Sequence, residues 1–256
     1  MNSYKVTEIT GRKRKSGLLL ASILWYNLLS RHGHRTDREE IGMMDDKYMA
    51  HLKYVKDYLI RNHGMASPNA LHPFRSRFQH SIRVLHWCFR LAEGVEGIDH
   101  EALYLAAIFH DVGYQGTDNG RHAIRSGKIF HEYAVAQNMD PLLRDKVERL
   151  IYAHSNKKLL KAPDIDKELI LLLEADLMDE EGAMGVVWDC MAMGNVHANS
   201  YAKAYYHIME NSNKEEPNPM VTEKAKAYWD EKKKIVARFA ELLADDLMIG
   251  SPYFDI

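Results

Sequence analysis

Three separate segments of the chain carry one helical pattern, in which an apolar stripe ends in a histidine or an aspartate on its own face. Side chains at positions i, i+3, i+4 and i+7 lie on one side of an α-helix. We therefore expect each of these polar groups to point inward with its apolar neighbours. The three sets are Leu103, Ala106, Ala107 and His110; Val147, Leu150, Ile151 and His154; and Leu169, Leu172, Leu173 and Asp176.

His80 gives the mirror case, because its imidazole begins an apolar stripe that continues through Val84, Trp87 and Leu91. A single inward histidine is more often a hydrogen-bonded core residue than a ligand, and a single carboxylate can be satisfied by a backbone group or a water. An unpaired buried carboxylate costs several kcal/mol, however, so four helices that turn such groups inward indicate a shared cation. Imidazoles together with carboxylates suit a first-row transition metal.

The same periodicity predicts an all-α fold, since no stretch alternates with period two for long enough to indicate a strand. We expect a bundle with a helical extension at each end, and charged residues 31–40 as a loop. The predicted domains are an N-terminal extension at 1–65, a metal-binding domain at 66–210 and a C-terminal amphipathic helix at 211–256. The predicted helices are 18–31, 45–62, 74–93, 100–112, 120–137, 140–155, 166–178, 183–210 and 219–247.

Composition limits the partners that this chain can have. The net charge is −2, so no global basic field predicts a nucleic-acid polymer as ligand. The apolar run Leu18–Leu29 is too short to cross a bilayer, and we expect no stable membrane insertion. The two cysteines, Cys88 and Cys190, lack zinc-ribbon spacing, and reduced thiols fit a cytoplasmic protein. A homodimer is left open.

The sequence around the inward-pointing residues His80, His110 and Asp176 resembles the HD superfamily of metal-dependent phosphohydrolases. That family carries a His, then a His-Asp pair, then a distant Asp, on separate helices. The resemblance covers about residues 72–195 and implies an α-helical fold with divalent metal, either one or two ions of Mn, Fe, Co, Ni or Mg. The matching stretches are Arg-Phe-Gln-His80-Ser-Ile-Arg-Val, Ala-Ala-Ile-Phe-His110-Asp111-Val-Gly-Tyr and Glu-Ala-Asp176-Leu-Met-Asp.

Some members of that family hold two metals with two further histidines, and this chain has His122 and His154 at matching places. The resemblance then implies that Asp111 bridges both ions and orients the nucleophile as the catalytic residue. The alternative for both histidines is a supporting or substrate-contacting imidazole. Asp179 is open between two roles, support of the site by a hydrogen bond and capping of the next helix.

The function implied is hydrolysis of a phosphate ester by a metal-bound hydroxide, with a nucleotide or a related small phosphorylated metabolite as substrate. Two other functions stay open. A di-iron oxygenase of the HD fold has overlapping motifs, whereas the intact ligand set argues against a non-catalytic sensor that binds a nucleotide. A phosphate needs cationic partners. The candidates near the ends of the metal-bearing helices are Arg77, Arg83, Arg125 and Lys157.

Overall fold

The computed structural model describes residues 35–66, 72–115, 120–196 and 200–253, with side chains from Lys47 onward. The predicted helix at 18–31 lies outside these residues. The described part of the chain is helical, with no strand beyond an isolated bridge between Ala66 and Ser76. The all-α prediction is therefore confirmed. The elements are α2 (Arg35–Arg61), α3 (Arg77–Ala92), α4 (His100–Phe109), α5 (His122–Ala136), α6 (Pro141–Ala153), the 3₁₀-helix η1 (Lys157–Lys161), α7 (Lys167–Asp179), α8 (Ala183–Gly194), α9 (Tyr201–Glu210) and α10 (Glu223–Asp246).

Two predictions of helix boundaries are wrong. Helix α2 begins at Arg35, within the segment predicted as a loop, because charge alone does not oppose a helix and Arg and Glu are good helix formers. The single helix predicted over 183–210 is two helices. Gly194 and Asn195 end α8, and the Ser200 hydroxyl accepts a hydrogen bond from the Lys203 backbone N–H to start α9.

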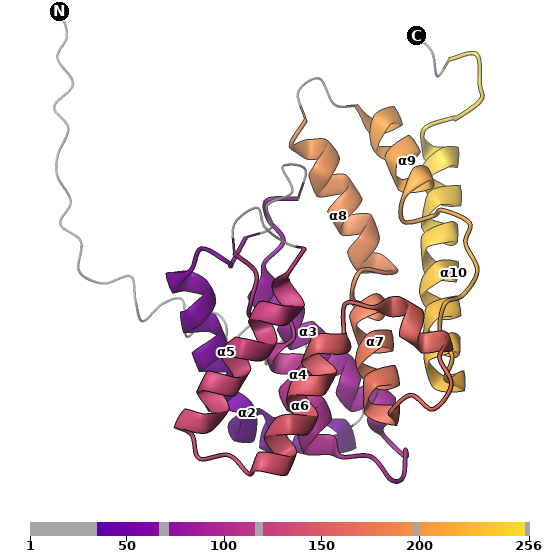
Figure 1. The fold of residues 1–256 in the computed structure, drawn as a ribbon. Coiled ribbons are helices and arrows are strands. Elements are labelled where there is room, and N and C mark those ends of the chain that lie inside the picture. The colour runs from indigo at the N-terminus through magenta and orange to yellow at the C-terminus, as the bar shows by residue number, and fades with distance from the viewer. Residues whose placement is uncertain (1–34, 67–71, 116–119, 197–199, 254–256) are drawn as a thin grey trace, which may run out of the picture. The chain divides into compact units, whose positions relative to one another are not determined.

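The chain divides into two compact units, residues 1–50 and 51–256, and the candidate site lies wholly in the second. Helix α4 is at the centre of that unit, where it packs against α3, α6 and α7 (Figure 1). Every residue from Ala102 to Phe109 is buried, as expected for a helix that is apolar on all sides. Helices α5 and α6 pair beside it. The apolar residues of all three predicted stripes are buried, which confirms the inward direction of each stripe.

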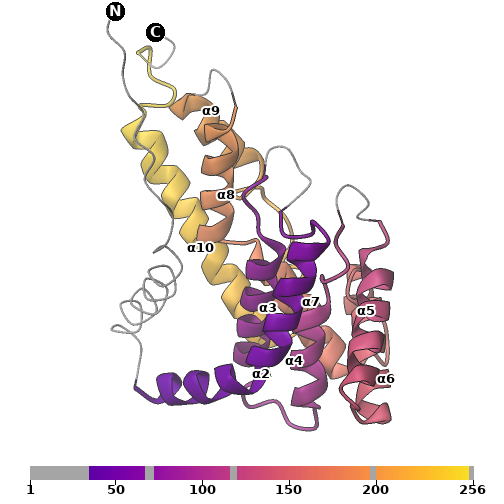
Figure 2. The same cartoon turned by 90° about the vertical axis from the view of Figure 1, so that its left-hand side faces the viewer.

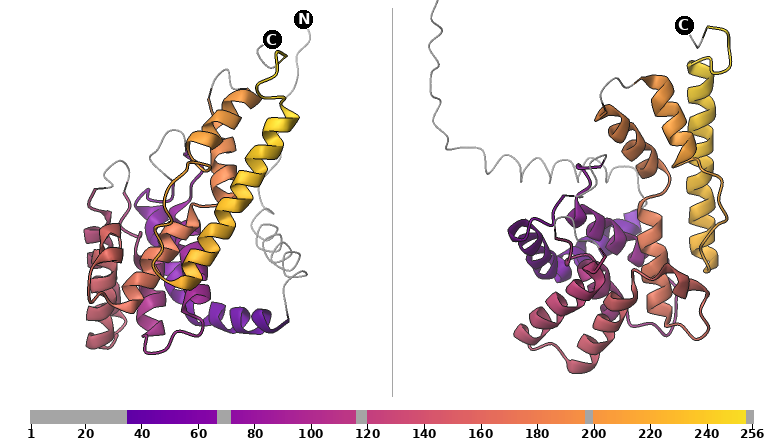
Figure 3. Two further views of the ribbon diagram at one scale, coloured as in Figure 1. Left: turned by 90° about the vertical axis from the view of Figure 1, so that its right-hand side faces the viewer. Right: turned by 45° about the horizontal axis from the view of Figure 1, so that its top comes forward.

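Helices α8, α9 and α10 form a second packed group, with α10 lying along the other two in Figure 2 and Figure 3. Val186, Ile208 and Val236 make a small core between these three helices. Glu174 of α7 links this group to the central helices. Its carboxylate accepts hydrogen bonds from the backbone N–H groups of Val221 and Thr222, at 2.7 and 2.8 Å. The segment before α10 is thereby fixed to the helix that carries Asp176.

Candidate metal centre

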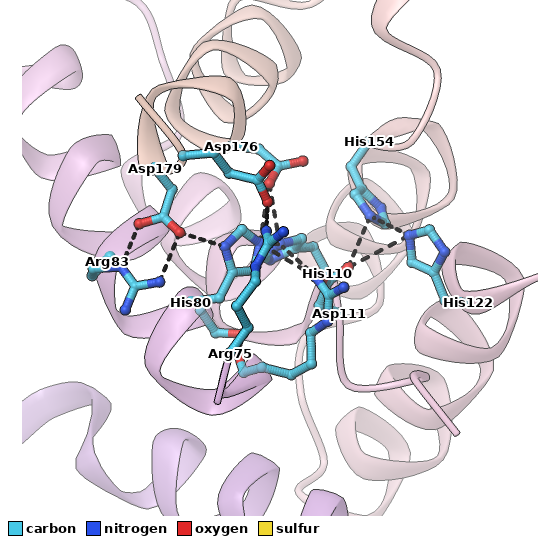
Figure 4. A network of polar contacts seen from close by, with 12 residues as sticks. Arg75, His80, Arg83, His110, Asp111, His122, His154, Asp176 and Asp179 are labelled. Atoms are coloured by element: carbon cyan, nitrogen blue, oxygen red, sulfur yellow. Dashed lines mark hydrogen bonds and ion pairs between the residues drawn. The ribbon is translucent and has the colours of Figure 1, made fainter. Parts of the chain in front are cut away.

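The six predicted ligands come from five helices and lie close together in space (Figure 4). Each of them lies at or next to the end of its helix. The Ser76 hydroxyl caps α3 and places His80 in its first turn. His110 and His154 are the residues at which α4 and α6 end, and Asp111 follows His110. His122 is the first residue of α5, and Asp176 lies in the last turn of α7. Helix ends far apart in the chain thus direct their polar groups to one place.

The first group of donor atoms consists of Nε2 of His80, Nε2 of His110 and Oδ1 of Asp176. His80 Nε2 lies 3.1 Å from each of the other two, and His110 Nε2 lies 3.8 Å from Asp176 Oδ1. The Oδ2 atom of Asp111 lies 3.4 Å from His80 Nε2 and 3.7 Å from His110 Nε2. Four donor atoms therefore surround one small volume.

The second group lies on the other oxygen of Asp111. His122 Nε2 and His154 Nε2 are 3.1 Å apart, and they lie 3.5 and 3.3 Å from Asp111 Oδ1. Figure 4 shows Asp111 between the two groups of imidazoles. One carboxylate thus presents an oxygen to each group.

The donor set fits a cation, because imidazole nitrogens and carboxylate oxygens from several helices converge on one place. A carbonyl oxygen can only accept, so Nδ1 of His110 donates to Ala107 O at 2.8 Å, and Nδ1 of His154 donates to Ile151 O at 2.6 Å. In a neutral imidazole this leaves the lone pair on Nε2. These Nε2 atoms face other imidazole nitrogens and carboxylate oxygens at the distances above. His110 and His154 thus each direct a lone pair toward this place, which is what a metal ligand must do.

The pKa values of the first group show how strongly its charges interact. Burial lowers the pKa of His80, but hydrogen bonds to Asp176 and Asp179 outweigh burial and raise it to about 9. Burial lowers the pKa of His110 to about 4, despite nearby Asp111 and Asp176. Burial raises the pKa of Asp111, yet the surrounding imidazoles reverse the effect and hold that pKa well below its usual range. The aspartate is therefore ionised, as a metal ligand must be.

Asp179 supports the site and does not cap the next helix. Its Oδ2 accepts a hydrogen bond from Nδ1 of His80 at 2.7 Å, and Arg83 donates to both of its oxygens at 2.5 and 2.9 Å. The N-cap of α8 is Gly182, which has no side chain to form a cap. A carboxylate on the far nitrogen of an imidazole fixes its tautomer and its direction. Of the two roles left open for Asp179, the structure shows the hydrogen bond to His80.

Gly113 and Tyr114 place His122. A Cβ atom on Gly113 would lie 2.5 Å from both the carbonyl oxygen of His122 and the backbone nitrogen of Ser126. The glycine therefore allows the start of α5 to approach closely. The Tyr114 ring stacks on the His122 ring at a centroid distance of 4.5 Å. Tyr114 stands in the stretch that resembles the family but was not predicted as a site residue, although an aromatic residue four positions after His110 was the available signal.

The candidate metal centre borders a cavity of about 520 Å³. Some of the predicted cationic side chains also line this cavity. Arg77 and Lys157 line it, with Arg77 at 3.3 Å from Asp111 Oδ2 and Lys157 paired with Asp176. Arg83 pairs with Asp179, and Arg125 donates to Gly113 O; neither lines the cavity. A substrate contact for Arg83 or Arg125 stays a prediction that this placement does not favour.

Comparison with known proteins agrees with this geometry. The chain matches the HD domain family over residues 77–181. No curated protein matches it. Bacillus subtilis YpgQ in complex with ADP is 18% identical with a TM-score of 0.54, covering 82% of this chain and 98% of its own. A second structure of Bacillus subtilis YpgQ is 19% identical with a TM-score of 0.53, covering 78% of this chain and 95% of its own. A Lactobacillus plantarum protein is 19% identical with a TM-score of 0.50, covering 80% and 98%.

At these identities the likeness to the solved structures shows the fold alone. The family match includes His80, His110, Asp111 and Asp176, together with His122 and His154. Two sets of donor atoms, one from His80, His110 and Asp176 and one from His110, Asp111 and His154, each lie within 4.8 Å of one another and fit the metal-binding pattern of the family. The HD domain is characteristic of a superfamily of metal-dependent hydrolases. Among the described residues, no helix is long and apolar enough to span a membrane. Residues 77–181 of this chain therefore match the HD domain family, and their clustered His and Asp side chains fit its metal-binding motif.

Proposed function

We propose that this protein is a metal-dependent phosphohydrolase that acts on a nucleotide or a related small phosphorylated metabolite. The observation that supports it best is the position of Asp111, with Oδ2 in one group of imidazoles and Oδ1 in the other. His80, His110 and Asp176 would hold one divalent ion, and His122 and His154 a second, with Asp111 shared. A divalent ion lowers the pKa of coordinated water and neutralises charge on phosphoryl oxygens.

The chain supplies the remaining parts of such a site. Arg77 and Lys157 face the cavity, where their positive charges would hold phosphate oxygens. The Arg77 guanidinium lies over the Tyr114 ring at 3.9 Å, so it is positioned before a substrate arrives. Asp179 orients His80. The ADP bound to Bacillus subtilis YpgQ supports a nucleotide as the class of substrate.

The first test is a screen of the purified protein with Mn, Fe, Co, Ni and Mg. The substrates are nucleoside mono-, di- and triphosphates, cyclic nucleotides and an aryl phosphate, and elemental analysis gives the resident metal. We expect turnover of at least one nucleotide. A mixed-valent di-iron signal without phosphohydrolysis would instead support an oxygenase, and tight nucleotide binding without turnover under any metal would support a sensor.

The second test uses Asp111→Ala. We expect loss of bound metal and of activity with helicity retained, because the ligands lie at helix ends and do not build the helices. Asp145→Ala is the control, since Asp145 is exposed and its ion pair is with its neighbour Arg144. Full turnover in Asp111→Ala would remove Asp111 from the mechanism.

The third test asks whether two ions bind. We expect His154→Ala to lower the metal content by about half, because His154 belongs only to the second group while the first keeps His80, His110 and Asp176. Elemental analysis of both proteins gives the ratio directly. An unchanged ratio would reduce His154 to a supporting residue.

A further inference from the structure

The cavity beside the candidate metal centre has a second wall, which comes from the C-terminal part of the chain. Glu216, Pro217, Pro219 and Trp229 line the same cavity as five of the six clustered residues, all except the fully buried His110. Leu177, Glu180 and Glu181, from the end of α7 and the turn after it, complete this wall. The first wall is rich in imidazoles and cations, whereas the second combines apolar side chains with carboxylates. The two walls therefore suit two chemically different parts of one ligand.

Specific contacts hold the second wall in place. Glu174 fixes the backbone at Val221 and Thr222, as described above. Lys233 of α10 donates to the backbone oxygens of Ser212 and Lys214, both at 3.3 Å. The same ammonium group lies 3.4 Å from a carboxylate oxygen of Glu216 and 3.4 Å from one of Glu181. A wall fixed in this way is organised before a ligand binds, which lowers the entropy cost of binding.

Glu181 presents a carboxylate in this wall. Its Oε2 is buried and forms an ion pair with the ammonium group of Lys233 at 3.4 Å. Burial raises the pKa of this carboxyl despite the nearby lysines. A carboxylate has about four acceptor sites, so one ion pair leaves Glu181 able to accept from a ligand in the cavity that it lines. An ionised carboxylate accepts and cannot donate, and it therefore selects ligands that carry N–H or O–H groups.

We infer that the second wall recognises an amino-bearing nucleobase, with Glu181 accepting from its exocyclic amino group. This inference rests on the proposed function, in which the first wall holds the phosphate. The apolar surfaces of Pro217, Pro219 and Trp229 suit a flat aromatic ring better than they suit a hydroxylated sugar. A cavity of about 520 Å³ is within the usual range for a small-molecule site. Adenine, guanine and cytosine carry the required amino group, and uracil and hypoxanthine do not.

The test compares pairs of nucleotides that differ by an amino group against an oxo group. ATP is compared with ITP, and CTP with UTP, by kcat/KM under the metal that gives most turnover. We expect wild type to prefer ATP and CTP about tenfold, or about 1.4 kcal/mol. Glu181→Gln should reduce both ratios to about twofold or less, because half of the acceptor capacity is replaced by an N–H₂ donor.

Glu215→Gln is the matched control, since Glu215 is exposed, adjacent to Glu216 and outside the cavity. Equal kcat/KM for both pairs in wild type would overturn the inference, and so would the same change of ratio in Glu215→Gln. Calorimetric binding of AMP and IMP separates this result from failure of the proposed function. A preference for AMP that Glu181→Gln removes would support recognition of the nucleobase by the second wall even without hydrolysis. Equal binding of AMP and IMP, or no binding of either, would reject it.

Discussion

Helix α7 carries two acidic residues with opposite roles, the buried Glu174 and the partly buried Asp176. They are two positions apart, so their side chains point about 200° from each other around the helix. Glu174 faces the C-terminal segment, where Val221 N–H, Thr222 N–H and the Thr222 hydroxyl all donate to it. Asp176 faces the imidazoles of His80 and His110 and the ammonium group of Lys157. One helix thus joins a structural carboxylate to a candidate ligand.

The difference shows that burial of a carboxylate does not by itself indicate a metal. Glu174 has a donor for each of its oxygens, and nothing remains for an ion to satisfy. Asp176 lies beside two imidazoles that belong to the candidate metal centre, those of His80 and His110. The partners decide between the two roles, and four predictions test that distinction.

The largest effect is expected for Asp176→Ala. Loss of a ligand should lower activity about 1,000-fold, equivalent to about 4 kcal/mol of transition-state stabilisation. The free energy of unfolding of the metal-free protein should change by less than about 1 kcal/mol, because the side chain is at a helix end and its partner Lys157 is partly exposed. Steady-state kinetics and denaturant unfolding give the two values. A large loss of stability with activity retained would reverse the assignment.

Glu174→Ala should show the opposite profile. Its removal leaves two backbone N–H groups and one hydroxyl without their acceptor, which should lower the free energy of unfolding by about 3 kcal/mol. Glu174→Gln is the matched control, with a loss of about 1 kcal/mol, because an amide oxygen can still accept from both backbone groups. If Glu174→Ala folded but lost its metal as completely as Asp176→Ala, the structural role of Glu174 and the ligand role of Asp176 could not be distinguished.

Asp179→Asn tests the carboxylate that holds the candidate ligand His80 and lies on the same face of α7 as Asp176. The pair with Arg83 is weakened and the hold on His80 loosens, so metal affinity should fall about 10- to 100-fold. Competition with a chromophoric chelator measures the affinity. Asp166→Asn is the control, because Asp166 precedes the same helix, is exposed and makes no side-chain cap. Equal affinities in both variants would show that Asp179 does not tune the site.

The smallest effect is expected for Lys157→Met. Lys157 competes with a metal for Asp176, so its removal should raise metal affinity by up to about fivefold, the value of a partly exposed ion pair. The same change should raise KM for a phosphorylated substrate, because a cation leaves the cavity. A lower metal affinity would mean that Lys157 supports Asp176 rather than competing with it.

The sequence alone determined which residues point inward. The spacing of apolar residues placed His80, His110, His154 and Asp176 on the buried faces of four helices, and the family resemblance added Asp111 and His122. The all-α fold followed from the same periodicity. Helix breaks were less predictable: the end of α8 depends on a glycine, an asparagine and a serine cap within a long helical pattern. The domain limits at residues 65 and 210 stay predictions.

Only the tertiary structure decided which residues contact those inward-pointing side chains. Periodicity gives the face of a helix but not the neighbour across from it, because that neighbour is distant in sequence. Asp179 and Glu174 are equally buried acids on α7, and only their partners distinguish the support of His80 from the attachment of the C-terminal segment. The same limit hid the second wall, where Glu216 and Trp229 border a cavity that begins at His80. A contact between distant segments is a property of packing, and no local pattern records it.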